Sequence, residues 1–234
     1  AGGRFERDEV RFALAGGSEQ SREWTHFSPK LALQYQWRQD AQVYASVADG
    51  FRAGGFNAFA PEAYRRYQPE RVRSFELGAK GRLLDRRLRY GASVYLMDVR
   101  DMQVQQIGSP GQMFLTNAAS ARPVGVEAEL QYLLGSGWQI QAALGLNRTR
   151  FREFKDGAND YKGNHNPLAS DATGHLGVRY DAPQGWYAQA HLNGASKVYL
   201  DAANKYGRAG YGVVNLMAGY TFGHTELSAY VHNA

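Results

Sequence analysis

The 234-residue sequence contains no cysteine, which excludes disulfide bonds, thiolate metal ligands and a cysteine nucleophile. It also has no run of about 18 or more apolar residues, which excludes a transmembrane helix. No basic stretch followed by an apolar stretch opens the chain, so we expect no signal peptide in this sequence. We therefore expect either a chain that has lost its signal together with further residues, or an internal fragment.

Signatures of enzymes and metal proteins are also missing. The six histidines show neither an HExxH motif nor paired metal spacing, so we expect no metal site and no cofactor. Asp160, His165, Ser170, Asp171 and His175 span a loop and a strand with nothing to fix their geometry, so no catalytic residue is predicted and the protein is not expected to be an enzyme. The net charge of +5 is spread along the chain, so nucleic acid is not an expected partner.

The sequence is instead rich in residues that favour strands and turns. It has 27 Gly and 15 Tyr, and aromatic residues make up 13% of it. Apolar and polar residues alternate along about eleven segments, for example at 31–37, 138–147 and 186–193. One face of each strand is apolar and the other is polar or small, which predicts an all-β, antiparallel protein.

The connections between these strands alternate in kind. Tight polar turns are expected at 38–40, 84–86, 135–137, 183–185 and 223–224, and longer stretches rich in Gly, Asn, Pro and charge lie at 53–69, 107–116, 152–169 and 200–209. Tight turns at one end and long loops at the other are typical of a transmembrane β-barrel with periplasmic turns and extracellular loops. A β-propeller is an alternative, because its blades of about 40 to 45 residues would repeat at a spacing comparable to that of the tight turns.

Aromatic residues near the tight turns favour the barrel over the propeller. They fall on the apolar side of their strands, as the girdle at a membrane interface requires: Tyr35, Trp37, Tyr90, Tyr132, Trp138, Tyr180, Trp186, Tyr220 and Phe222. We expect Leu144, Leu192, Leu216 and Leu227 to face lipid, and Gln141, Gln189 and Glu226 to face the lumen. The opposite side is too polar for a packed core, and a barrel of about 22 strands with a plugged lumen accommodates it.

Several motifs resemble those of TonB-dependent outer-membrane receptors, especially siderophore receptors. The segment YASVADGFRAGGFN at 44–57 is similar to the family's strand leading into an extracellular loop, and 68–80 is similar to its "PE…E.G.K" strand. Residues 117–129 resemble its "NA…G.E.E" strand, and 215–220 and 230–233 resemble its late strands. The resemblance covers nearly the whole chain in order.

The resemblance implies that residues 1–234 form part of the C-terminal half of a multi-pass outer-membrane barrel, about half of 22 strands, with open edges. The plug domain, the TonB-box segment and the final strands are expected to be absent from this sequence. The implied function is import of a ferric siderophore or similar scarce nutrient, energised by the TonB–ExbB–ExbD complex through the missing plug segment. Outer-membrane lipid and lipopolysaccharide are the implied surroundings. A passive porin-like channel and a soluble carbohydrate-binding β-protein remain as alternatives.

Two sets of residues are candidates for function. Long-loop residues that combine cations with aromatic rings suit an anionic iron chelate: Arg52, Phe56, Asn57, Tyr64, Arg65, Arg66, Tyr67, Tyr161, His165, Tyr206 and Arg208. Charged residues predicted to line the lumen suit contact with a plug: Glu76, Lys80, Arg82, Glu127 and Glu129. The alternatives are a generic polar loop surface for the first set and a generic polar lumen wall for the second.

Overall fold

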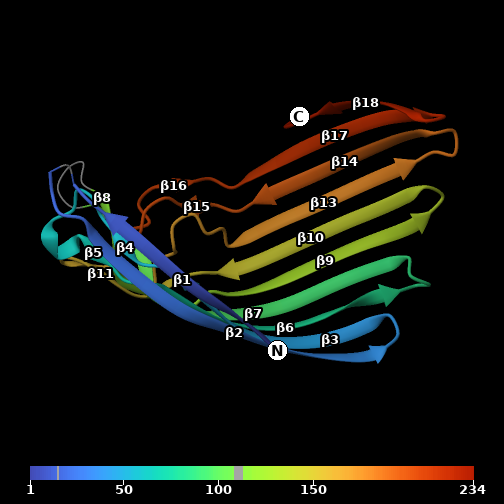
Figure 1. The fold of residues 1–234 in the computed structure, drawn as a ribbon. Coiled ribbons are helices and arrows are strands. Elements are labelled where there is room, and N and C mark those ends of the chain that lie inside the picture. Colours follow the sequence, from blue (N-terminus) through green and yellow to red (C-terminus); the bar gives the residue numbers. More distant parts are fainter. Residues whose placement is uncertain (15, 108–112) are drawn as a thin grey trace.

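The computed structural model describes residues 1–14, 16–107 and 113–234, and a single curved antiparallel sheet dominates it (Figure 1). The main path of this sheet has eleven strands, and their order across the sheet is the order in which they occur in the chain. Neighbouring strands are antiparallel, which confirms the predicted all-β, antiparallel fold. They are β1 (Gly2–Phe12), β2 (Gln20–Arg38), β3 (Ala41–Arg52), β6 (Glu70–Leu83), β7 (Leu88–Ile107), β9 (Val124–Gly135), β10 (Trp138–Arg148), β13 (Ala172–Asp181), β14 (Trp186–Ala195), β17 (Tyr211–Phe222) and β18 (Thr225–Val231).

The predicted connections are confirmed at one end of the sheet and refined at the other. Tight turns join β2 to β3, β6 to β7, β9 to β10, β13 to β14 and β17 to β18, and together they make the turn end. The long connections at the loop end contain short elements: β4 (Gly55–Phe56), η1 (Glu62–Tyr64), β5 (Arg66–Tyr67), β8 (Met113–Ala121), β11 (Phe151–Asp156), β12 (Asn159–Asp160), β15 (Val198–Tyr199) and β16 (Gly207–Arg208).

The region around 107–129 differs from the sequence prediction. The predicted loop at 107–116 is a strand from Met113 onward, and residues 108–112 of it lie outside the described part of the chain. The motif at 117–129, expected as one strand, is divided between β8 and β9. Pro123 lies at the break, and because proline has no N–H it cannot continue the hydrogen-bonded ladder. β8 consequently pairs with residues 99–107 of β7, at the loop end. β9 pairs with residues 88–96 of β7, nearer the turn end.

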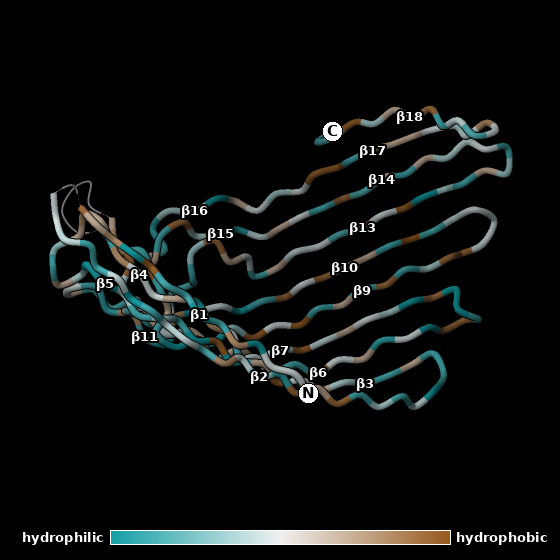
Figure 2. Tube along the Cα trace, in the orientation of Figure 1, coloured by the Kyte–Doolittle hydropathy of each residue, from teal (hydrophilic) through white to brown (hydrophobic). Residues whose placement is uncertain are grey.

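The strand register separates an apolar face from a polar face. Residues opposite each other in an antiparallel ladder share a face, and Leu144, paired with Gly174, lies on the same face as Leu192, Leu216 and Leu227. These four leucines are between 43% and 71% exposed, because no protein layer covers them. Along the long strands, apolar and polar residues are interleaved as this arrangement requires (Figure 2).

Aromatic side chains gather on the apolar face near the turn end, as predicted. The rings of Trp138 and Tyr180 lie 4.8 Å apart, and those of Tyr180 and Trp186 lie 5.1 Å apart. Tyr220 is the ladder partner of Trp186, and its ring stacks on Phe222 at 6.0 Å. The rings form a band across β10 to β17, which is the place that an interfacial girdle requires.

The polar face is the concave one, and it curves partly because glycines there lie under tyrosine rings. A Cβ at Gly78 would come within 2.5 Å of the Tyr44 ring, and one at Gly219 would come within 2.6 Å of the Tyr187 ring. Glycine allows this close approach, and an aromatic ring covers the backbone that it exposes. β1 and β18 lie at the two ends of the sheet and do not pair with each other, so the sheet is a partial barrel with open edges.

The buried hydrophobic cluster lies at the loop end, where β8 and β11 extend the sheet beside the last part of β7. Val104 and Ala119 pack with Phe151 and Phe154 there, and the last two are only 2% exposed. We call these four residues the loop core. Among the described residues, no helix is long and apolar enough to cross a membrane.

Candidate functional site

The connection between β3 and β6, residues 53–69, forms a hairpin at the loop end. β4 pairs with β5, and η1 lies between them. Asn57 fixes this hairpin to β8: its Nδ2 donates to Leu115 O at 2.8 Å and to Tyr64 O at 2.7 Å, and its Oδ1 accepts from Leu115 N at 2.9 Å. The candidate ligand residue Asn57 is therefore a structural clamp in this conformation.

Two further residues hold the base of the hairpin and were not singled out from the sequence. Gln103, buried on β7, donates from Nε2 to Ala53 O at 2.8 Å and to Gln68 O at 3.1 Å. Asn117 on β8 accepts from Gln68 N at 2.6 Å and donates back to Gln68 O at 2.7 Å. The only sequence signal was the position of Asn117 in the "NA" motif, whereas nothing marked Gln103.

The hairpin and the end of β3 next to it carry three arginines that lack carboxylate partners among the described residues. Arg52 and Arg66 are exposed and Arg65 is half-buried, and none of them forms an ion pair with any residue in 1–14, 16–107 or 113–234. Arg66 donates to Gln20 Oε1 at 3.0 Å. Arg73, by contrast, binds Asp49 through two hydrogen bonds of 2.7 and 2.8 Å. The hairpin thus presents positive charge that the surrounding described residues do not neutralise.

The aromatic candidates of the hairpin differ in exposure. Tyr64 is 45% exposed and stacks on Phe114 with ring centroids 4.7 Å apart. Phe56 is half-buried against Phe12 at 5.5 Å. Tyr67 lies over Gly55, where an added Cβ would meet its hydroxyl. Tyr64 is therefore the ring of this set with the most open surface.

The second predicted group comes from the connections 149–171 and 196–210. Tyr161 packs edge-on against Phe154 of the loop core at 5.2 Å. His165 is half-buried: its ring lies 5.2 Å from that of Tyr199, and its Nδ1 lies 3.3 Å from Asp171 Oδ1. Tyr206 is 71% exposed, and the Arg208 guanidinium lies 5.2 Å from the ring of Tyr211.

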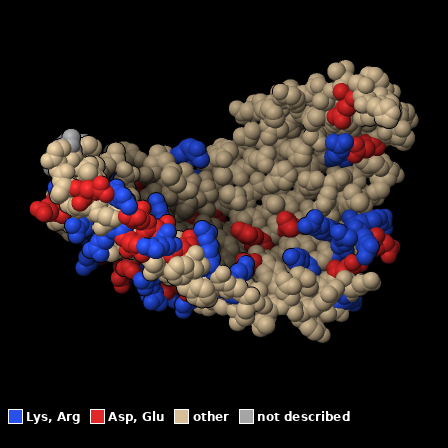
Figure 3. All heavy atoms as spheres, viewed as in Figure 1, with Lys and Arg blue, Asp and Glu red and all other residues tan. Residues whose placement is uncertain are grey.

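The two groups lie at the same end of the molecule and are linked through β8. Asn57 and Tyr64 contact β8, which pairs in turn with β11. The second group joins this assembly because Tyr161 packs on the loop core. In addition, the Asn204 side chain accepts from His165 N at 2.7 Å and donates to His165 O at 3.0 Å. The loop end is thus one connected surface, and Lys, Arg, Asp and Glu side chains crowd it in Figure 3.

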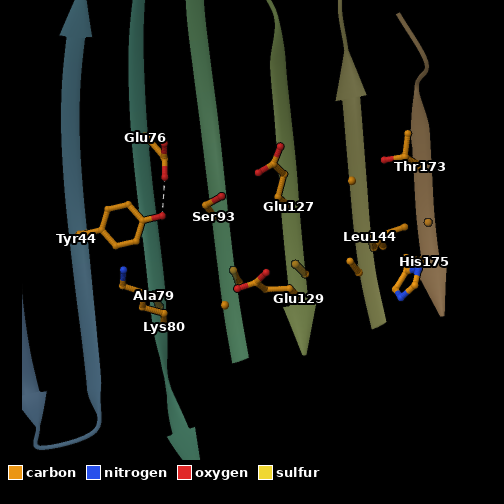
Figure 4. Close-up of a pocket in the computed structure, with 16 residues that line it drawn as sticks. Tyr44, Glu76, Ala79, Lys80, Ser93, Glu127, Glu129, Leu144, Thr173 and His175 are labelled. Atoms are coloured by element: carbon orange, nitrogen blue, oxygen red, sulfur yellow. Dashed lines mark hydrogen bonds between the residues drawn. The ribbon is translucent and has the colours of Figure 1, made fainter. Parts of the chain in front are cut away.

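The predicted lumen residues lie on the concave polar face, and four of the five line one hollow. This hollow has a volume of about 560 Å³ and includes Glu76, Lys80, Glu127 and Glu129 (Figure 4). The Tyr44 hydroxyl donates to Glu76 Oε1 at 2.5 Å. Arg82 lies outside the hollow, nearer the turn end, where its ladder partner is Arg89. With three carboxylates and one ammonium group, the hollow carries negative charge.

The alternating faces, the aromatic band and the polar concave wall define an outer-membrane β-barrel. The family model of the TonB dependent receptor-like β-barrel matches residues 1–234, so the chain belongs to this family. The family consists of outer-membrane transport receptors and not of enzymes. The apolar face therefore meets lipid, the polar face lines the lumen, the loop end is extracellular and the turn end is periplasmic.

Individual receptors are similar to this chain in sequence and in structure. The chain is 27% identical to the pesticin receptor of Yersinia pestis over 214 residues, which cover 87% of this chain and 30% of that receptor. The ferric yersiniabactin uptake receptor FyuA of Yersinia pestis superposes with a TM-score of 0.79 at 21% identity, covering 99% of this chain and 37% of that one. The siderophore receptor PiuA of Acinetobacter baumannii gives 0.77 at 18% identity, covering 93% and 33%. The chain thus spans about a third of the length of these receptors.

Proposed function

We propose that the protein to which this chain belongs imports an anionic ferric siderophore across the outer membrane. The observation that carries the proposal is the clamped extracellular hairpin: its Arg65 and Arg66, and Arg52 at the adjoining end of β3, have no carboxylate partner among the described residues. Ferric chelates are commonly anionic, and guanidinium groups bind such charge through charge-assisted hydrogen bonds. Tyr64 adds an exposed ring for stacking beside these cations.

The relatives support the same class of cargo. Of the proteins named above, the pesticin receptor is 27% identical to this chain, and the structure with the TM-score of 0.79 is an uptake receptor for ferric yersiniabactin. Iron stays in its chelator, so no side chain of this chain need ligate it. Within the second group, Tyr206 and Arg208 are exposed and are proposed as further contacts. The half-buried Phe56 and Tyr67 of the hairpin, and Tyr161 and His165 of the second group, are proposed to contribute as well.

We also propose which role each part of the whole receptor has. Residues 1–234 supply part of the barrel wall, and a plug domain elsewhere in the protein occupies the lumen and connects to TonB, ExbB and ExbD. Glu76, Lys80, Glu127 and Glu129 meet basic and acidic groups of that plug, with Arg82 nearer the periplasm. Outer-membrane lipid contacts the apolar face, and lipopolysaccharide contacts it in the outer leaflet.

The decisive experiment is a binding titration of the full-length receptor with ferric yersiniabactin as the first probe. Changing Arg52, Arg65 and Arg66 together to Ala should weaken binding at least tenfold, since one charge-assisted contact contributes about 1.5 to 3 kcal/mol. A matched control removes Arg38, Arg86 and Arg87 at the periplasmic turns and should leave affinity unchanged. Binding within twofold of the unmodified receptor in the first triple variant refutes the role of the hairpin.

Uptake measurements separate active import from a porin-like channel. Uptake of the radiolabelled ferric chelate should stop in cells without TonB and in cells whose proton gradient has been dissipated. Continued uptake under both conditions would show passive passage. The soluble carbohydrate-binding alternative is excluded by the family, whose members are outer-membrane barrels.

A further inference from the structure

Two histidines face each other across neighbouring strands on the lumen wall. His175 on β13 and His191 on β14 have ring centroids 5.4 Å apart, with the ring planes inclined by 24°. In the ladder, His175 lies opposite Asn193, and His191 lies opposite Gly177. The two histidines are therefore diagonal neighbours on one face, a separation that long side chains readily bridge.

The ring of His175 is held in the orientation that a metal ligand needs. Its Nδ1 lies 2.8 Å from the Oδ1 of Asn193. An amide oxygen only accepts hydrogen bonds, so Nδ1 carries a proton, and in the neutral tautomer with this proton the lone pair is on Nε2. Metal-bound histidines almost always donate their second ring N–H to a carbonyl or carboxylate in this way.

Gly177 leaves open the space into which both rings point. A Cβ placed on Gly177 would lie 2.7 Å from His191 Nδ1 and 3.3 Å from His175 Nε2. Both nitrogens therefore border the same small volume above the glycine. Gly177 does not have a left-handed φ, so the backbone itself would tolerate a side chain at this position.

The surroundings favour a cation. His175 lines the hollow that also contains Glu127 and Glu129, with Glu76 further along it (Figure 4). Carboxylates along a concave wall raise the local concentration of cations. Imidazole nitrogens prefer Cu²⁺, Zn²⁺ and Ni²⁺ over Mg²⁺ or Ca²⁺.

We propose that His175 and His191 form a two-ligand site for a divalent transition-metal ion on the lumen wall. Each nitrogen binds such an ion at about 2.0 to 2.1 Å, and the rings turn about their side-chain bonds to direct both nitrogens at it. No group of three or more candidate ligands occurs among the described residues, so water or a donor from the lumen completes the coordination. The site holds an ion that is free or only weakly chelated, and it does not depend on the siderophore proposed above.

The test uses the full-length receptor, purified without a histidine tag and titrated with CuCl₂. We expect one Cu²⁺ bound per receptor, with electron paramagnetic resonance showing two nitrogen ligands. The double change His175→Gln and His191→Gln should weaken this binding at least tenfold. The matched control His224→Gln, at the turn between β17 and β18, should leave it unchanged.

Two variants keep both histidines and so distinguish metal binding from a general loss of structure. Gly177→Ala should fill the space between the nitrogens and weaken Cu²⁺ binding at least tenfold, while Asn193→Ala should weaken it several-fold by freeing the His175 ring. Thermal unfolding of both variants should match that of the unmodified receptor. Unchanged Cu²⁺ affinity in the double histidine variant, or a spectrum with fewer than two nitrogen ligands, would show that the rings only pack against each other.

Discussion

Replacing Leu144 by Arg tests the assignment of the two faces most directly. Leu144 lies six residues along β10 from Trp138 of the aromatic band and is 50% exposed on the apolar face. At about 3.4 Å per residue and a strand tilt of about 40°, this places Leu144 roughly 15 Å above the girdle. The apolar band of such a barrel is about 25 Å tall, so Leu144 lies within a few ångströms of the bilayer midplane. A buried guanidinium at that depth should cost about 2 to 4 kcal/mol.

The measurement is denaturant unfolding of the full-length receptor in lipid vesicles, followed by tryptophan fluorescence. Gln141→Arg is the matched control, because Gln141 pairs with Gln131 and Gly177 on the lumen face and should cost less than about 1 kcal/mol. Leu146→Arg, two residues nearer the extracellular interface, should cost less than Leu144→Arg. Equal costs for Leu144→Arg and Gln141→Arg would refute the assignment of the faces.

Three further predictions concern the turns and loops. The hydrogen bond from the Arg86 guanidinium holds the pKa of Asp40 below its ordinary value, so this pair adds stability above the unfolded pKa of about 3.9 and loses it as the pH falls through the folded pKa. Arg86→Ala should raise the pKa of Asp40 toward its ordinary value in an NMR titration, and no change would refute the pairing. Asn57→Ala removes three hydrogen bonds and should speed amide exchange in residues 53–69, whereas Asn159→Ala on exposed β12 should not. Phe154→Ala should destabilise the loop core by about 3 to 5 kcal/mol, seen as faster proteolysis of the extracellular loops with unchanged unfolding of the barrel.

The barrel wall could be predicted from the sequence because its pattern is local. Each strand residue faces either lipid or the lumen, so apolar and polar residues alternate, and Leu144 and Gln141 could be assigned to faces without knowledge of their partners. The tight turns were equally visible, since Gly, Asp and Pro mark them. The assignment of the motif at 117–129 to a single strand was wrong, although Pro123 marks the break locally. The sequence could not show which part of β7 each half pairs with.

The loop surface and the lumen sites were decided by contacts between distant residues. Asn57 meets Leu115 across 58 positions of the chain, and Gln103 reaches Ala53 across 50, so neither clamp leaves a periodic signal in the sequence. His175 and His191 have no spacing typical of a metal site, and only the register of β13 against β14 places their nitrogens over Gly177. The sequence by itself determined which face each strand residue takes, because lipid and water select residue by residue. The tertiary structure decided which side chains meet, because register and loop packing arise only when separate strands pair.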